Sequence, residues 1–138
     1  MSHVTSPALR TVPTDHSRIG LIALWAAQLA LAGMFLLAGG SKLAGAPAMI
    51  ALFDAVGIGQ WFRYVTGLIE VGSAVALLVP ALAPFGAMAL VATMAGAVLT
   101  HLFIVGGSPL VPAVLLAGSL TVAWVRRDQI SKALSRMR

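Results

Sequence analysis

The chain has 138 residues, of which 59% are hydrophobic and 9% charged, and it contains no cysteine. A soluble domain carries about 25% charged residues, so the composition predicts an integral membrane protein and excludes disulfides, thiolate metal sites and thiol-based electron transfer. The net charge of +5 does not indicate a nucleic-acid binder, because the basic residues gather at the chain ends and not on a face interleaved with aromatic residues.

The predicted fold is all-α: an antiparallel bundle of four transmembrane helices, with a short amphipathic helix between the first and second spans. Residues 1–18 are polar and contain Pro7 and Pro13, which predicts a disordered tail. The apolar stretch 19–41 is long enough, at ~1.5 Å per residue, to cross a ~30 Å hydrocarbon core. Residues 47–58 are too short to span, and their apolar side chains recur at helical spacing, so they predict an amphipathic helix that lies in the interface or packs against the bundle.

Short turns join the remaining predicted spans, which are 61–79, 84–105 and 109–125. Two prolines enclose the first of these turns, and a Gly-Gly-Ser sequence forms the second. Such short connections require each helix to return directly, so successive spans are expected to be antiparallel neighbours. Residues 126–138 are predicted to form a basic tail in solvent.

The distribution of basic residues predicts the orientation of the chain. Four spans place both ends on one side, and seven of the nine Lys and Arg residues lie there. By the positive-inside rule, both termini are predicted to be cytoplasmic, with Lys42 and Arg63 on the outer side.

Small residues spaced four apart occur in two of the predicted spans, at Gly72 and Ala76 and at Ala92, Gly96 and Thr100. Small residues at this spacing let helix backbones approach closely in lipid. We therefore expect a tightly packed bundle, and we expect Gln28, which interrupts the apolar stretch of the first span, to form an interhelical hydrogen bond.

Charged groups inside a membrane cost several kcal/mol unless they are paired or hydrated, so three residues attract attention. Lys42 ends the first span, Glu70 lies ~13 Å along the second, and His101 lies about 25 Å along the third. All three therefore fall in the outer half of the bilayer. Lys42 is close enough to pair with Glu70, and His101 could supply or accept a hydrogen bond.

Further polar residues share the face of the second span that carries Glu70. They follow spacings of three and four, so the face is expected to point into the bundle; its members are Arg63, Thr66, Gly67, Glu70 and Ser73.

Two interpretations of this cluster stay open. In the first, Lys42, Arg63, Thr66 and His101 contact the oxygens of a quinone-like or anionic amphiphile, and Glu70 tunes the site or relays a proton. In the second, the Lys42 to Glu70 pair fixes the helix register and binds nothing. No catalytic residue is assigned. No metal site is predicted, because the other two histidines lie in the tail.

The sequence resembles the DoxX-like family of small four-helix membrane proteins. The resemblance covers about residues 19–125 and rests on Gly-x-x-Lys ending at Lys42, on Gly-x-x-Glu ending at Glu70, and on the short helical segment between them. The Leu-Leu-Val-Pro ending of the second span, at residues 77–80, also fits the pattern.

This resemblance implies an inner-membrane bundle and, as in the founding members, the membrane subunit of a thiosulfate:quinone oxidoreductase. By this resemblance, the quinone-binding role is assigned to Lys42 and Glu70 through their motifs, and only loosely to His101. We do not expect the chain to catalyse a reaction on its own. Similar animal proteins assist the assembly of other membrane proteins, so a scaffold role is the alternative. The expected partners are the lipid bilayer, a protein partner in the membrane or at the basic C-terminal tail, and further copies of the chain.

Overall fold

A computed structural model describes residues 15–136 and contains only helices within that range. The all-α prediction is therefore confirmed. Six α-helices and one short π-helix follow one another along the described residues: α1 (Asp15–Leu43), α2 (Pro47–Val56), α3 (Gln60–Leu78), α4 (Ala83–Thr100), the π-helix η1 (His101–Val105), α5 (Leu110–Val125) and α6 (Arg127–Ser135).

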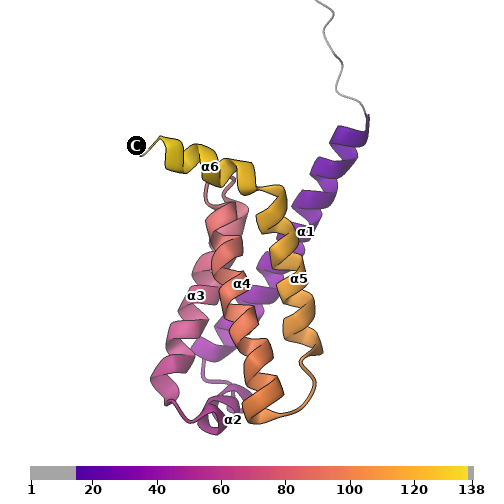
Figure 1. The fold of residues 1–138 in the computed structure, drawn as a ribbon. Coiled ribbons are helices and arrows are strands. Elements are labelled where there is room, and N and C mark those ends of the chain that lie inside the picture. The colour runs from indigo at the N-terminus through magenta and orange to yellow at the C-terminus, as the bar shows by residue number, and fades with distance from the viewer. Residues whose placement is uncertain (1–14, 137–138) are drawn as a thin grey trace, which may run out of the picture.

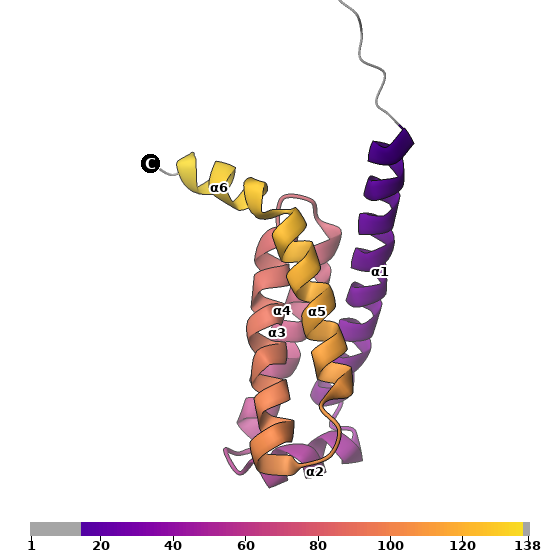
Figure 2. The same ribbon diagram turned by 45° about the vertical axis from the view of Figure 1, so that its right-hand side comes forward.

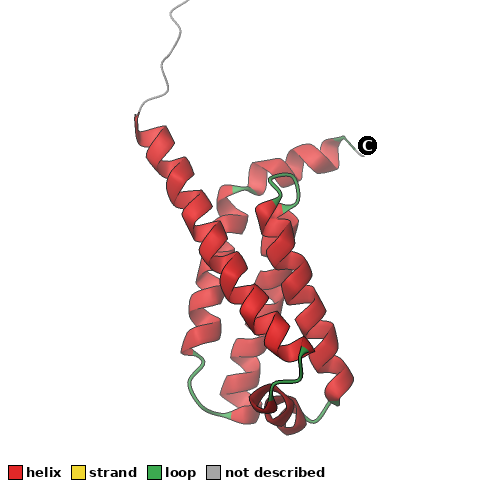
Figure 3. Cartoon of the chain, turned by 180° about the vertical axis from the view of Figure 1, so that it is seen from behind, coloured by secondary structure: helices red, strands yellow, loops and turns green. Residues whose placement is uncertain are grey.

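The four long helices lie lengthwise beside one another, and two short helices lie across the ends (Figures 1 and 2). Helix α2 crosses the end at which α1 stops and α5 begins, and α6 crosses the opposite end, over the turn between α3 and α4. The N-terminal half of α1 leans away from the other helices in every view, including the view from behind (Figure 3). The two ends are called below the α2 end and the α6 end.

Three helical segments are long and apolar enough to cross a membrane: 18–43, 60–78 and 83–105. Helix α5 is apolar throughout but has 16 residues, and α2 is shorter still. Large apolar side chains cover the outside of the bundle, with Phe103 78% exposed and Leu37 73% exposed. This arrangement suits a lipid solvent, because an aqueous protein of this size rarely exposes so continuous an apolar surface.

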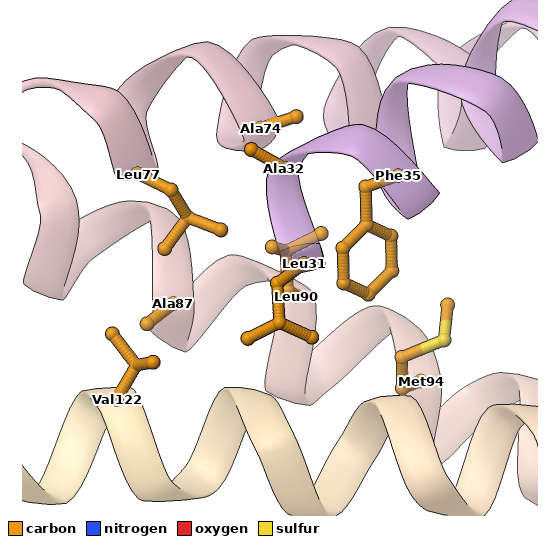
Figure 4. Close-up of a cluster of buried hydrophobic side chains, with 9 residues drawn as sticks. All are labelled: Leu31, Ala32, Phe35, Ala74, Leu77, Ala87, Leu90, Met94 and Val122. Atoms are coloured by element: carbon orange, nitrogen blue, oxygen red, sulfur yellow. The ribbon is translucent and has the colours of Figure 1, made fainter. Parts of the chain in front are cut away.

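The apolar core lies where α1, α3, α4 and α5 meet, from the middle of the bundle toward the α6 end (Figure 4). Phe35 of α1, Leu77 of α3 and Leu90 of α4 are fully buried and provide its largest side chains. Three buried alanines, Ala32, Ala74 and Ala87, fill the space between these larger side chains. The core residues are Leu31, Ala32, Phe35, Ala74, Leu77, Ala87, Leu90, Met94 and Val122.

The closest helix contacts involve other glycines than those expected. A Cβ added at Gly39 would lie 2.8 Å from the Gly67 carbonyl oxygen, and one at Gly86 would lie 2.8 Å from the Ser73 carbonyl oxygen. Gly72 and Gly96 have nothing within 4 Å of such a Cβ. Ala76, the partner of Gly72 in the four-residue spacing, does lie in a close contact, because a Cβ added at Gly86 would lie 2.9 Å from its Cβ. The bundle is therefore tight, but spacing alone does not say which small residue meets a neighbouring helix.

The helix boundaries differ slightly from the predicted ones. Helix α1 begins at Asp15, so the helix extends beyond the apolar stretch that begins at residue 19. The rest of the predicted disordered tail, residues 1–14, lies outside the described residues. The predicted third span ends in η1, and Gly106 and Gly107 then adopt positive φ angles to form the turn into α5.

Candidate functional site

A buried ion pair joins α1 to α3 near the α2 end. The Lys42 ammonium donates to both carboxylate oxygens of Glu70, with Nζ 2.7 Å from Oε2 and 3.0 Å from Oε1. The side chain of Glu70 is 1% exposed and that of Lys42 12%. The predicted pairing is thus confirmed. Because the two charges cancel at hydrogen-bond distance, the pair can sit inside an apolar bundle.

Two glycines explain why the motifs Gly-x-x-Lys and Gly-x-x-Glu occur together. Gly39 and Gly67 lie against each other's backbone, and neither position has room for a Cβ without movement of the neighbouring carbonyl. At this contact the backbones of α1 and α3 touch, about one helical turn before Lys42 on α1 and before Glu70 on α3. The lysine side chain can then extend along α3 and reach the carboxylate.

Arg63 supports the end of α1. Its guanidinium donates to the backbone carbonyl of Lys42, and its Nε donates to Gln60 Oε1 at 2.6 Å. It also stacks over Tyr64, with Cζ 4.3 Å from the ring centroid. Although Arg63 is buried, it does not line the cavity described below. Its contacts therefore position the residue that carries the ammonium.

A cavity of about 710 Å³ lies beside the ion pair, between α2 and the ends of the long helices. Four of the five predicted site residues line it: Lys42, Thr66, Glu70 and His101. Most of the remaining wall is apolar. A volume in the range of about 300–1,000 Å³ with a few convergent polar groups is typical of small-molecule sites.

Helix α2 forms the wall of the cavity at the end of the bundle. Pro47 begins the helix, and Gly57 ends it with a φ of 77°, in the left-handed region that favours glycine. The apolar face, including Met49 and Phe53, points to the cavity. The opposite face carries Asp54, which accepts a hydrogen bond from Gln60 at 2.7 Å and so ties α2 to the start of α3.

His101 enters the cavity wall at the point where α4 changes to the π-helix. Its Nδ1 lies 2.9 Å from the Ala97 carbonyl oxygen, and a carbonyl oxygen can only accept, so Nδ1 carries a proton. In the neutral ring, Nε2 is then the acceptor. The Thr66 hydroxyl similarly donates within its own helix, to the carbonyls of Phe62 and Arg63 at 3.0 Å, which leaves its lone pairs available.

A second buried polar cluster lies at the α6 end, and its arginine was missed at the level of sequence. Gln28 donates to the Leu77 carbonyl oxygen at 2.6 Å, as expected of an interhelical hydrogen bond, and accepts from Arg126 Nε at 2.9 Å. Arg126 is 5% exposed and lies over the Trp25 ring, with Cζ 5.6 Å from the centroid. With its amide nitrogen facing the Pro80 carbonyl, Gln129 accepts from Arg126 Nη1 at 3.2 Å.

The charge of Arg126 persists despite burial. Burial lowers the pKa of its guanidinium, because desolvation disfavours the charged form, but an arginine pKa starts so high that the group stays protonated. In the sequence, Arg126 stands first in a run of basic residues after an apolar stretch, and such a run is typical of a solvated tail. The one sequence feature that separates Arg126 from the other basic residues is that it directly follows the apolar span, one residue before Arg127.

No group of three or more His, Asp or Glu residues in the described part of the chain could hold a metal ion. The site chemistry therefore rests on the ion pair, the imidazole and the hydroxyl.

No curated protein and no solved structure matches the chain. The sequence pattern that defines the DoxX-like family matches residues 26–124, which include the Gly-x-x-Lys and Gly-x-x-Glu motifs, the helix α2 and most of α5. This match covers well over half of the sequence and agrees with the resemblance drawn from those motifs. The chain belongs to the DoxX-like family.

Proposed function

We propose that this membrane protein binds a quinone-like lipophile in the cavity beside Lys42 and Glu70, and that it serves as a non-catalytic subunit of a membrane oxidoreductase. The observation that carries the proposal is the position of an ion pair and a histidine in the wall of a mostly apolar cavity of about 710 Å³. A quinone needs an apolar space for its ring and chain and a few polar groups for its oxygens.

Different polar groups would bind the oxidised and the reduced form of the ligand. A quinone carbonyl accepts hydrogen bonds, and Lys42 has a third N–H beyond the two that it donates to Glu70. A quinol hydroxyl donates, and His101 Nε2 and the Thr66 oxygen can accept. Glu70 holds the ammonium in place and would relay a proton to the quinone oxygen during reduction.

The proposed topology has four spans, with both termini cytoplasmic and the cavity in the outer half of an inner membrane. What supports the fourth span is that α5 runs alongside α4 and is apolar throughout, with exposed apolar side chains such as Val114 at 61%. The asymmetry of basic residues between the two ends supports the orientation. Because the chain lacks cysteine, Ser108→Cys and Ser135→Cys can each be labelled alone in intact cells. A membrane-impermeant maleimide should label only Ser108→Cys. Labelling of Ser135→Cys instead would show that the chain has the opposite orientation.

The binding site is tested with a double variant that keeps the fold. Replacing both members of a buried ion pair by apolar residues of similar volume often leaves stability nearly unchanged. Lys42→Met with Glu70→Met should therefore unfold at nearly the wild-type temperature in detergent, yet bind a short-chain alkyl benzoquinone at least about tenfold more weakly, since each lost hydrogen bond to a charged group is worth about 1.5–3 kcal/mol.

The matched control for the binding assay is Thr121→Val, which removes a hydroxyl from an exposed position on α5 that does not line the cavity. Its quinone affinity should equal that of the wild type. His101→Leu should weaken binding without affecting the ion pair. Wild-type affinity in the double variant would rule out the cavity as the quinone site.

The alternative function is a scaffold for another membrane complex, in which the pair only fixes α1 against α3. The observation that favours it is that Lys42 and Glu70 already satisfy each other and that Arg63 holds the Lys42 backbone. Purification in mild detergent followed by native mass spectrometry separates the two functions. A stoichiometric protein partner without a bound lipophile supports the scaffold, and a bound quinone supports the leading proposal.

A further inference from the structure

The guanidinium of Arg126 is a buried cation without a carboxylate beside it. Among the side chains that the structure describes, salt bridges join Lys42 to Glu70 and Arg127 to Asp128, and none includes Arg126. Its hydrogen-bond partners, Gln28 and Gln129, are neutral amides. Because both partners are neutral, one full positive charge remains at this position. A cation removed from water is costly unless an anion or several hydrogen bonds compensate.

One nitrogen of this guanidinium still reaches the surface. Nε donates to Gln28 and Nη1 to Gln129, whereas Nη2 has no partner in the described part of the molecule. Every enclosed side-chain nitrogen and oxygen there has a partner. Among the described residues, Nη2 is therefore accessible, with two N–H groups available to an acceptor from outside.

The surroundings of Nη2 match the level of lipid headgroups. Arg126 lies between the last residue of α5, which is Val125, and the first of α6. Trp25 of α1 and Trp124 of α5 flank it, and each tryptophan lies beneath an arginine: Arg126 over Trp25, and Arg127 over Trp124 with Cζ 4.4 Å from the ring. Tryptophan is enriched at the membrane interface, where its ring sits among the headgroups.

The helices diverge at this position. The N-terminal half of α1 leans away from α5 toward the α6 end (Figure 2), and its apolar residues Ile19 and Ile22 are exposed. A lipid chain can therefore lie along the exposed residues of α1 while its headgroup reaches Arg126. Basic positions between transmembrane helices bind the headgroups of anionic lipids in this manner.

We propose that Arg126 binds the phosphate of an anionic phospholipid, with Nη2 donating to phosphate oxygens, Arg127 adding charge at the rim and the acyl chains lying against α1. The occupant is a lipid and not a free anion, because the site combines a cation with interfacial tryptophans and exposed apolar side chains. This site is separate from the cavity at the α2 end and does not depend on the proposed function.

The test uses the full chain, delipidated in detergent and titrated with phosphatidylglycerol or with phosphatidylcholine of the same acyl chains. Native mass spectrometry measures the bound lipid. The wild type should bind phosphatidylglycerol more tightly, and Arg126→Gln should lower that affinity by about fivefold, as expected from a contribution of about 1 kcal/mol per basic residue. Phosphatidylcholine binding should change little.

Two controls make the result specific to Arg126. Arg136→Gln changes the net charge equally at an exposed position near the end of α6, and it should keep the wild-type preference. Arg126→Lys keeps the charge, but the shorter lysine side chain cannot donate to Gln28 and to a lipid phosphate at the same time. Its preference for phosphatidylglycerol should therefore be reduced. Equal losses in Arg126→Gln and Arg136→Gln would indicate diffuse attraction and overturn the proposal.

Wild-type measurements keep the proposal testable even if Arg126→Gln does not fold. Absence of a preference for phosphatidylglycerol over phosphatidylcholine in the wild type would overturn it. Displacement of the lipid by millimolar inorganic phosphate would assign the site to a free anion and would also overturn it. Retention of phosphatidylglycerol in phosphate, together with a higher unfolding temperature of the lipid-bound protein, supports it.

Discussion

At the α2 end of the bundle, a buried lysine donates to both oxygens of a buried glutamate, whereas at the α6 end a buried arginine donates to two neutral amides. The first arrangement carries no net charge and borders a cavity with mostly apolar walls. The second keeps a full positive charge and presents one nitrogen to the surface. This difference in charge is the reason that we propose different ligands at the two ends, a neutral lipophile at one and an anionic headgroup at the other.

The largest effect is expected from breaking the ion pair on one side only. Glu70→Ala leaves the Lys42 ammonium in an apolar environment without its counter-ion, which typically costs about 3–5 kcal/mol. The free energy of unfolding, measured by denaturant titration in mixed micelles, should fall by this amount. The double variant Lys42→Met with Glu70→Met is the control and should recover most of the loss. Equal losses in both variants would mean that packing, and not charge, dominates at this end.

An intermediate effect is expected from separating α1 and α3 beside the pair. Gly39→Ala places a Cβ 2.8 Å from the Gly67 carbonyl oxygen, and a helix backbone cannot move aside locally, so we expect a loss of about 2–3 kcal/mol in unfolding free energy. Gly72→Ala is the matched control, because it adds the same methyl group on α3 where nothing lies within 4 Å. A similar loss in both variants would contradict the proposed backbone contact.

The smallest effect is expected at the α6 end. Gln28→Leu removes the acceptor of Arg126 Nε and the donor to Leu77, but Gln129 and the accessible surface still solvate the guanidinium, so we expect a loss of about 1–2 kcal/mol. Thermal unfolding with and without phosphatidylglycerol checks this value, and the added lipid should restore part of the loss. A loss as large as that of Glu70→Ala would show that the amide network is as critical as the ion pair.

The difference between the two ends also decided how much could be predicted from sequence. Lys42 and Glu70 stand out because each is an isolated charge in or at the end of an apolar stretch, and opposite charges at compatible depths predict a pair. Gln28 stands out for the same reason. Arg126 does not, because it adjoins four other basic residues beyond the apolar stretch, and burial there depends on α6 turning across the bundle.

The cavity was beyond sequence analysis for a related reason. Its walls come from five helices, and its position depends on α2 folding back under the bundle and on the π-helical end of α4. Periodicity identified the apolar face of α2 and the inward face of α3, but it could not say that the two faces enclose a space. Nor could it distinguish Gly39, which touches another backbone, from Gly72, which faces outward.

The π-helix η1 has a consequence for how relatives of this chain can differ. A π-helical turn holds about one residue more than an α-helical turn, so η1 is equivalent to a one-residue insertion after His101. A family member with one residue fewer between His101 and Gly106 could close the same turn as a regular α-helix. We therefore expect alignments of the family to place a single-residue gap here, and members with the gap to keep the register of α5 against the cavity, because the shorter α-helical turn absorbs the deletion.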